Sequence, residues 1–570
     1  MEAFAKSRIS RRAVVFVLTV VLLVNFYLFW YGWPSNLNPG LESHSEPQAS
    51  PSESSIEEIW TNSTANGSDL TISVPEYHAP NSTPLADRQA DFIQHLFKQL
   101  NENNPQCRNV RVDEDTGGIE FDAVNDTPRP NYIVREDEMR EPLAKAHRDF
   151  VAAIQDFDVS KLPYNSGTRG IISSAGGDYF PTFVTSLRMI RRTGCTLPVE
   201  VFLIDWSEFE PYICEVVLPK LNAKCIVLAE MIEKAHFPKK NIPQLKGYQI
   251  KPFAMLLSSF ETFIWMDSDC VPLHEPGTLL DSEPFTSTGL VTWPDYWANT
   301  VAPLYFNISL QPEPPMTARQ STESGIMLVS KQQHFLTLSL STYYNYYGPD
   351  YYWALLGQGA YGQGDKDTFI QAAAAVNAPF YAVSEPVATV ERPVRTGKMG
   401  FAAMVQTDPV QDYNLTSQGL WRVKNSSVAP APRAFFVHAS NPKFNAAGNI
   451  LEESSRKDGK PGRLWAWPED VTRRFGYDAE RAYWDELKTV TCTLEHAFFS
   501  WQQKSGLCEG VQRIWEIAIN NPDAPIPGFT GEAPVDFNTS TYASILTSVL
   551  NKDEQLSSHH LPGFKRDLGL

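Results

Sequence analysis

The segment that most constrains the fold is ETFIWMDSDCVPLH, residues 261–274. Residues 263–266 are all apolar and predict a buried strand, which ends at Asp267 and Asp269. Side chains two positions apart in extended backbone point the same way, so these carboxylates can share one cation. Oxygen ligands of this kind suit Mg²⁺ or Mn²⁺ and leave coordination positions for a diphosphate. We therefore predict a metal and diphosphate site at the end of this strand.

The Asp-x-Asp pattern alone is weak, because it also occurs three more times, at residues 113–115, 156–158 and 365–367. Only the pair at 267–269 directly follows an apolar strand pattern. Its position after a predicted strand therefore makes the pair at 267–269 the best candidate for the metal site.

Strand and helix patterns alternate from Gly170 onward. This order predicts an α/β fold with a doubly wound, mostly parallel sheet, whose ligands bind at the carboxyl ends of the strands. No G-x-G-x-x-G follows the first predicted strand, residues 171–174, and no phosphate-binding G-x-x-x-x-G-K-[ST] occurs in the chain. A metal held by carboxylates is thus the expected means of binding a nucleotide. An amphipathic helix near residue 86 is expected to begin the folded part.

Further candidates lie near the ends of later predicted elements. Glu323 precedes the strand 324–330, and the glycine-rich loop 357–364 leads into Asp365, the predicted N-cap of the next helix. A surface loop with a capping Asp would explain this segment equally simply. His438 ends the strand 434–437, where a neutral imidazole could be a third metal ligand, although a lone His is more often structural.

Residues 13–33 form an uncharged, mostly apolar run that is long enough to span a bilayer. Four basic residues precede it, which predicts a cytosolic tail (1–12) and a luminal body. A cleaved signal peptide is the alternative, but the run is long and lacks a small-residue cleavage site at its end. The Ser-, Pro- and acid-rich segment 34–85 is expected to be a disordered, glycosylated stem.

Luminal features and charge support this organisation. Seven cysteines predict some disulfides with one thiol left over, and we expect Cys492 to pair with Cys508 and Cys270 to be buried. The net charge of −18 argues against a nucleic-acid partner. Eight N-x-S/T sequons follow the apolar run, at Asn62, Asn66, Asn81, Asn125, Asn307, Asn414, Asn425 and Asn538.

Four ordered blocks resemble a known family: residues 170–203 (GIISSAGGDYFPTFVTSLRMIRRTGCTLPVEVFL), FIWMDSDCVPL, ESGIMLVSK and GDKDTF. They are similar to the fungal Golgi α-mannosyltransferases that branch and cap cell-wall mannan, over roughly residues 170–444. The resemblance implies a type II Golgi membrane enzyme with a GT-A fold, GDP-mannose as donor, Mn²⁺ as cofactor and retention of anomeric configuration. We expect one luminal catalytic domain (86–570), with a core at about 165–445 and a helical extension at about 446–520.

The resemblance also implies roles for individual residues. Asp267, Asp269 and His438 are expected to bind the metal, and Lys443 to reach the phosphates, although its spacing from His438 is unusual. The turn glycines Gly176 and Gly177 are expected to contact the nucleotide sugar. Three carboxylates are expected to act on the donor sugar: Asp365, Asp367 and Glu323.

Within this family, the segments LRMIRRTGCTLPVEVFL and GDKDTF are more similar to the members that form α-1,2 linkages than to those that form α-1,3 linkages. Outside the family, the alternatives are a transferase using another nucleotide sugar, a glycoside hydrolase with two carboxylates about 5 to 10 Å apart, and a non-catalytic membrane-tethered glycan-binding protein. A mannose-containing glycan is the expected acceptor, and homo- or hetero-oligomers with other mannosyltransferases are left open.

Overall fold

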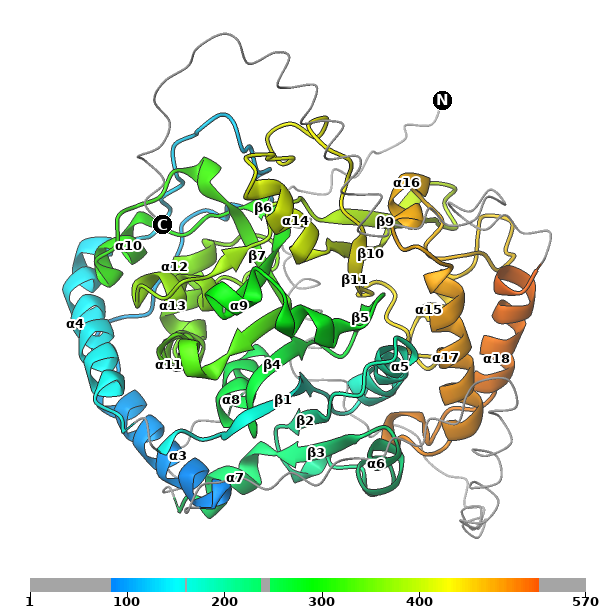
Figure 1. Ribbon diagram of the computed structural model, residues 1–570, viewed down its shortest axis with the longest axis horizontal. Helices are drawn as coiled ribbons and strands as arrows, with labels where there is room; N and C mark the ends of the chain where they lie inside the picture. The colour runs from blue at the N-terminus through cyan, green and yellow to red at the C-terminus, as the bar shows by residue number, and fades with distance from the viewer. Residues whose placement is uncertain (1–83, 159–160, 237–244, 246, 522–570) are drawn as a thin grey trace, which may run out of the picture. The chain divides into compact units, whose positions relative to one another are not determined.

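The computed structural model describes residues 84–158, 161–236, 245 and 247–521 (Figure 1). The predicted tail and anchor (1–33), nearly all of the predicted stem and four sequons, at Asn62, Asn66, Asn81 and Asn538, lie outside these residues. Among the helices of the described residues, none is long and apolar enough to cross a membrane. The anchor and the stem therefore remain predictions.

A seven-stranded sheet forms the centre of the described chain, in the order β3-β2-β1-β4-β7-β6-β8. Neighbouring strands are parallel except where β7 lies antiparallel to both β4 and β6, so the predicted α/β fold with a mostly parallel sheet is confirmed. The strands are β1 (Asn165–Ser174), β2 (Val199–Leu203), β3 (Ala223–Val227), β4 (Phe260–Met266), β6 (Leu290–Ala298), β7 (Gln320–Ser330) and β8 (Tyr381–Ala382).

The second half of strand β4, residues 263–266, is buried on both faces, which explains its unbroken apolar sequence. Phe263 and Trp265 belong to a core that also contains helix side chains, while Ile264 and Met266, which alternate with them, are buried as well. The helices of this core include the predicted amphipathic helix, which buries its apolar stripe. They are α3 (Leu85–Glu102), α4 (Glu136–Gln155), α8 (Ile250–Leu257), α10 (Pro303–Ser309) and α11 (Lys331–Tyr346).

A second, antiparallel sheet, which the sequence did not predict, has the order β5-β11-β10-β9. Strand β5 (Cys270–Pro272) begins directly after Asp269, and its partner β11 (Ala434–His438) places His438 opposite Cys270. The strand predicted at 434–437 therefore exists, but it belongs to this sheet. The remaining strands are β9 (Ala388–Pro393) and β10 (Met399–Thr407).

The chain after β11 is largely helical, and helix α17 (Ala479–Leu494) packs against α5 (Tyr179–Arg192), the helix that follows β1 (Figure 1). Arg188 of α5 pairs with Glu486 of α17 at 2.6 Å. The other α-helices are α6 (Leu218–Lys220), α7 (Leu228–Lys234), α9 (Phe285–Thr288), α12 (Trp353–Gly357), α13 (Thr368–Ala375), α14 (Pro409–Thr416), α15 (Ile450–Glu453), α16 (Glu469–Arg473), α17 (Ala479–Leu494) and α18 (Leu507–Ile514).

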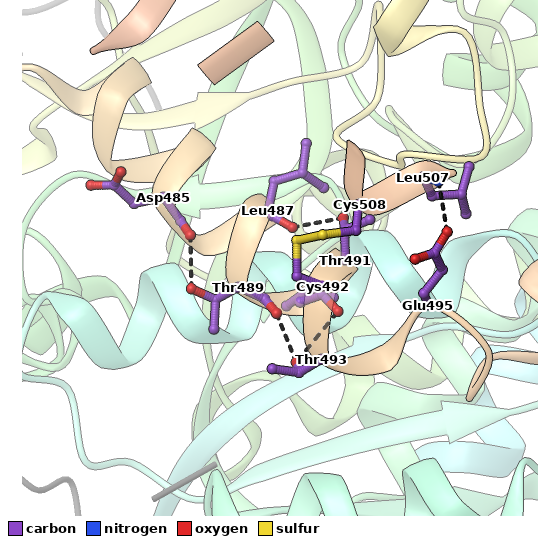
Figure 2. The surroundings of a disulfide bond; sticks show 10 residues. Asp485, Leu487, Thr489, Thr491, Cys492, Thr493, Glu495, Leu507 and Cys508 are labelled. Carbon is purple, nitrogen blue, oxygen red and sulfur yellow. Dashed lines mark hydrogen bonds between the residues drawn. A yellow bond between two sulfur atoms is a disulfide. The ribbon is translucent and has the colours of Figure 1, made fainter. Parts of the chain in front are cut away.

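Two disulfides are present, one of which links α17 to α18 through Cys492 and Cys508, as predicted (Figure 2). The other joins Cys214 to Cys225, next to the sheet edge. The prediction of a single remaining thiol is wrong, because three cysteines are free: Cys107, Cys195 and Cys270. Cys270 is fully buried, as expected.

Removing the α17–α18 disulfide should destabilise the C-terminal helices. The bond closes a loop with a sequence separation of 16, and cross-links of that length stabilise a fold by roughly 3 kcal/mol. The double variant Cys492→Ser/Cys508→Ser should therefore lower the urea midpoint and speed proteolysis within α18. Cys107→Ser is the matched control, since Cys107 is a free thiol. Equal stability of the double variant and the control would contradict the prediction.

Candidate active site

The site is built where β4 ends and β7 passes beside it. The amide of Asp267 donates to the carbonyl of Gly325 at 2.8 Å, which continues the pairing of the two strands beyond Met266. The indole Nε1 of Trp265 donates to Oδ1 of Asp267 at 2.8 Å. The first predicted carboxylate is thus held by the strand that precedes it.

The second carboxylate, Asp269, lies between two basic side chains. Nε2 of His438 is 3.2 Å from its Oδ1, and the Lys443 ammonium donates to its Oδ2. Burial by itself raises the pKa of Asp269, but the charges of His438 and Lys443 outweigh this effect and hold its pKa well below the usual value. Asp269 is therefore a carboxylate at neutral pH, although its side chain is only 4% exposed.

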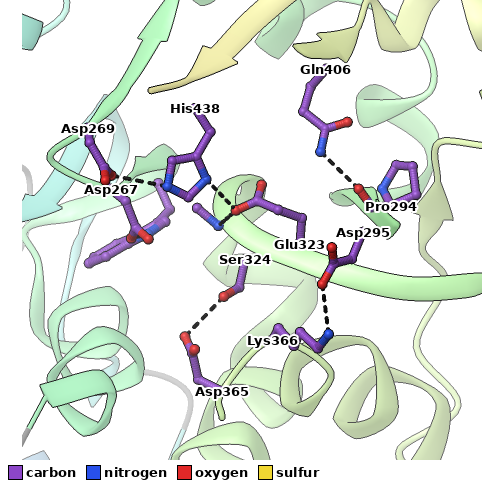
Figure 3. A network of polar contacts seen from close by, with 12 residues as sticks. Asp267, Asp269, Pro294, Asp295, Glu323, Ser324, Asp365, Lys366, Gln406 and His438 are labelled. Atoms are coloured by element: carbon purple, nitrogen blue, oxygen red, sulfur yellow. Dashed lines mark hydrogen bonds and ion pairs between the residues drawn. The ribbon is translucent and has the colours of Figure 1, made fainter. Parts of the chain in front are cut away.

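Glu323 orients His438 from the opposite side (Figure 3). Its Oε1 is 3.0 Å from Nδ1 of the imidazole, so a proton on Nδ1 leaves Nε2 turned toward Asp269. Among the described residues, none hydrogen-bonds to the buried Oε2 of Glu323. Burial lowers the pKa of His438, but contact with Cys270 and Asp269 raises it well above its ordinary value.

Gly325 allows the side chains of Glu323, Cys270 and His438 to lie close together. A Cβ at this position would lie 2.5 Å from Oε1 of Glu323 and 3.0 Å from both Sγ of Cys270 and Nδ1 of His438. Only a residue without a side chain leaves room for these three groups. Sequence reasoning missed Gly325, although it stands within the ESGIMLVSK block.

Lys251 is a second site residue that sequence reasoning missed. Its Nζ lies 3.2 Å from Oδ1 of Asp267 and 2.9 Å from Oδ2 of Asp365, and it donates to the carbonyl of Ser324 at 2.9 Å. Burial lowers the pKa of Lys251, but the two carboxylates raise it above the usual value, so the ammonium stays charged. The sequence does contain one feature that could have identified Lys251: it is the one charged residue of the otherwise apolar helix α8.

The two acids of the 365–367 segment have different surroundings. Asp365 faces Lys251 and Ser324, and burial raises its pKa despite the lysine. Asp367 is the residue that precedes α13, so the prediction that Asp365 is the N-cap is wrong. The Asp367 carboxylate accepts from the Ser321 hydroxyl at 2.7 Å and from the Thr322 amide at 3.0 Å, which ties the start of α13 to β7.

Gly176 and Gly177 form the turn between β1 and α5, as the sequence suggested. A Cβ on Gly176 would lie 2.5 Å from the Glu208 carboxyl carbon, and Gly177 has a φ of +52°, so both positions favour glycine. Tyr179 follows this turn, and the Lys443 ammonium lies 5.2 Å from the centre of its ring. Lys443 therefore lies near the start of α5, which this turn precedes.

The charged cluster, in which Asp267, His438 and Lys443 are half-buried, contains more carboxylates than cationic groups. It contains four carboxylates, two lysine ammonium groups and His438. An excess of carboxylates over cationic groups favours the binding of a divalent cation. The carboxylates are Asp267, Asp269, Glu323 and Asp365, and the lysines are Lys251 and Lys443.

The ligand atoms of Asp269, Cys270 and His438 lie within 4.8 Å of one another, which meets the spacing of a metal site. Burial raises the pKa of the Cys270 thiol to about 12, and hard cations such as Mg²⁺ and Mn²⁺ prefer carboxylate to sulfur ligands. Asp269 and His438 thus fit a cation best, while Asp267 is bonded to Lys251 and Trp265.

Comparison with known proteins identifies the family. Residues 168–318 and 315–408 match a family model described as "Mannosyltransferase putative". The α-1,2-mannosyltransferase MNN21 of Candida albicans is 31% identical over 489 residues, which cover 74% of each chain. The α-1,2-mannosyltransferase MNN2 of Saccharomyces cerevisiae is 29% identical, covering 62% of this chain and 69% of the relative.

A solved structure, that of the galactosyltransferase LgtC, aligns with 38% of this chain and 73% of its own. Its identity is 12% and its TM-score 0.26, values too low to carry an argument. The family is therefore assigned from the sequence relationships. The chain belongs to the family of fungal α-mannosyltransferases and is a glycosyltransferase.

Proposed function

We propose that this protein is a divalent-metal-dependent, retaining GT-A transferase that moves mannose from GDP-mannose to a mannose residue of a glycan. The observation that carries the proposal is the buried cluster around Asp269, in which Glu323 orients His438 toward the carboxylate. A carboxylate and an oriented imidazole are a common ligand pair for Mn²⁺. The family membership supplies the reaction class.

The cation, when bound, would stabilise the negative charge that develops on the departing diphosphate. Asp269 and His438 would bind it directly, with Asp267 reaching it or its water ligands. Glu323 would keep His438 in the correct tautomer through Nδ1. Cation binding at Nε2 requires a neutral imidazole, so the proton that His438 carries would leave on binding.

Other residues of the cluster would position the donor. Lys443 lies between Asp269 and Tyr179 and would turn to the diphosphate oxygens, since an ammonium binds phosphate as a point charge. The backbone of Gly176 and Gly177 would line the donor site. Asp365 would face the mannose, and Asp367 would hold the start of α13 in place.

Retention of configuration is part of the proposal. The departing phosphate would take the proton of the acceptor hydroxyl, so no side chain needs to act as a general base. We favour an α-1,2 linkage because the relatives named above are α-1,2-mannosyltransferases; an α-1,3 linkage is the runner-up. Incubation with GDP-mannose, Mn²⁺ and α-mannose oligosaccharides, with NMR of the product, tests both points. A β-linked product would contradict retention.

We also propose a single-pass type II location in the Golgi membrane. The proposal rests on the apolar run 13–33, the basic residues before it and the sequons after it. Protease protection of the body in sealed vesicles from a fungal cell would test the orientation. Digestion of the body in intact vesicles would contradict it.

Removal of divalent metal should abolish transfer, and Mn²⁺ should restore it. Asp269→Asn should lower kcat/KM on the order of a hundredfold or more, because it weakens stabilisation of the leaving group. Because His438 must lose a proton, the Mn²⁺ concentration for half-maximal rate should fall as pH rises. Asp113→Asn is the matched control, since Asp113 belongs to an Asp-x-Asp pair outside the cluster. Full activity in EDTA, or equal activity of the two variants, would contradict the proposal.

Lys251→Met should destabilise the fold by about 3 kcal/mol at neutral pH, because it leaves buried carboxylates without a counter-charge. Without the ammonium, the folded-state pKa of Asp365 rises further above its unfolded value. The loss relative to wild type should therefore be small near the unfolded pKa of about 4 and grow as pH rises.

Urea unfolding at acidic and neutral pH measures the difference. Lys98→Met, which removes an exposed ammonium 4.0 Å from Glu102, is the control and should change little at either pH. A pH-independent loss in Lys251→Met would show that Lys251 does not balance Asp365.

A further inference from the structure

Two aromatic rings form a pair next to the carboxylate cluster and have no part in the proposed metal and donor sites. The rings of Trp297 in β6 and Tyr361 in the loop 357–364 meet edge to face, with centroids 5.4 Å apart. Tyr361 is 61% exposed, and Trp297 is half-buried. We define this pair as the aromatic platform.

The platform is joined to the site by one ion pair. Nζ of Lys366 donates to the Tyr361 carbonyl at 2.8 Å and to Oδ2 of Asp295 at 2.7 Å. Asp295 stands two residues before Trp297, and Lys366 follows Asp365 directly. Figure 3 shows Asp295 and Lys366 beside Glu323 and Asp365. The platform therefore borders the cluster on the side of α13.

A separate segment, residues 115–120, holds both rings in place. The amide of Tyr361 donates to the carbonyl of Gly117 at 3.2 Å, and the amide of Ala298 donates to that of Ile119 at 2.8 Å. A Cβ on Gly118 would lie 2.7 Å from the Trp297 ring and 2.9 Å from the Tyr361 ring. Backbone without a side chain thus packs directly against the pair.

A bracing of this kind fixes an exposed ring before any ligand arrives, which lowers the ordering cost of binding. An exposed aromatic face suits the apolar C–H face of a pyranose ring, and nearby polar groups can meet its hydroxyls. The residues that match the family description span 168–408, so segment 115–120 precedes them.

We propose that the aromatic platform binds a mannose residue of the acceptor chain, next to the mannose that receives the new sugar. This inference rests on the proposed function. The platform acts in acceptor binding and makes no contact with the reacting atoms. An acceptor longer than one sugar therefore gains affinity from it, whereas the donor and a single mannoside do not.

The test compares Tyr361→Ala, Tyr361→Phe and wild type with three substrates. For an α-mannose trisaccharide, Tyr361→Ala should raise KM about tenfold, as expected for the loss of one aromatic contact with a sugar ring. Tyr361→Phe should retain the wild-type value, because the ring remains. KM for GDP-mannose and the rate with methyl α-mannoside should not change. Trp421→Ala, at a half-exposed tryptophan elsewhere on the surface, is the matched control.

Binding of the trisaccharide by calorimetry, without donor, separates this inference from the proposed function. Weaker binding to Tyr361→Ala than to Tyr361→Phe supports the platform even if GDP-mannose is not the donor. Equal binding and equal KM overturn it and leave the proposed function standing. A higher KM for GDP-mannose in Tyr361→Ala also overturns it, because the ring would then contact the donor.

Discussion

The ion pairs of Asp269 are the interaction on which the site depends. A buried carboxylate is costly unless opposite charges and hydrogen bonds compensate for its lost hydration. Lys443 and His438 supply both, and each comes from the second half of the chain. Asp269 directly precedes β5, and the antiparallel pairing of β5 with β11 brings His438 to it. The small antiparallel sheet is thus what assembles the proposed metal ligands.

A second set of charges holds the other half of the site. Lys251 lies between Asp267 and Asp365, and its ammonium also reaches the carbonyl of Ser324. One buried lysine therefore links α8, the end of β4, β7 and the segment before α13. Because removal of one partner of a buried pair leaves an uncompensated charge, this arrangement fixes the relative positions of those elements.

The sequence predicted the parts of this site that depend on local pattern. The apolar strand before Asp267, the strand ending at His438 and the Cys492–Cys508 bridge could be predicted, because period, length and spacing carry that information. The partners of Asp269 and Asp365 could not be derived from pattern, because they come from elements that are far apart in the sequence. Lys251 is the clearest example. The sequence shows a lysine in an apolar helix, but its role depends on contacts with Asp267 and Asp365 that only the structure shows.

Binding of the cation by Asp269 and His438 is tested most directly by the position of Mn²⁺ in a crystal of the catalytic body, located by its anomalous scattering. We expect a peak about 2 to 2.5 Å from a carboxylate oxygen of Asp269 and from Nε2 of His438, with Lys443 turned away from the carboxylate. A peak bound elsewhere, or no peak at these two residues when Mn²⁺ and GDP-mannose are present at saturating concentration, would contradict it.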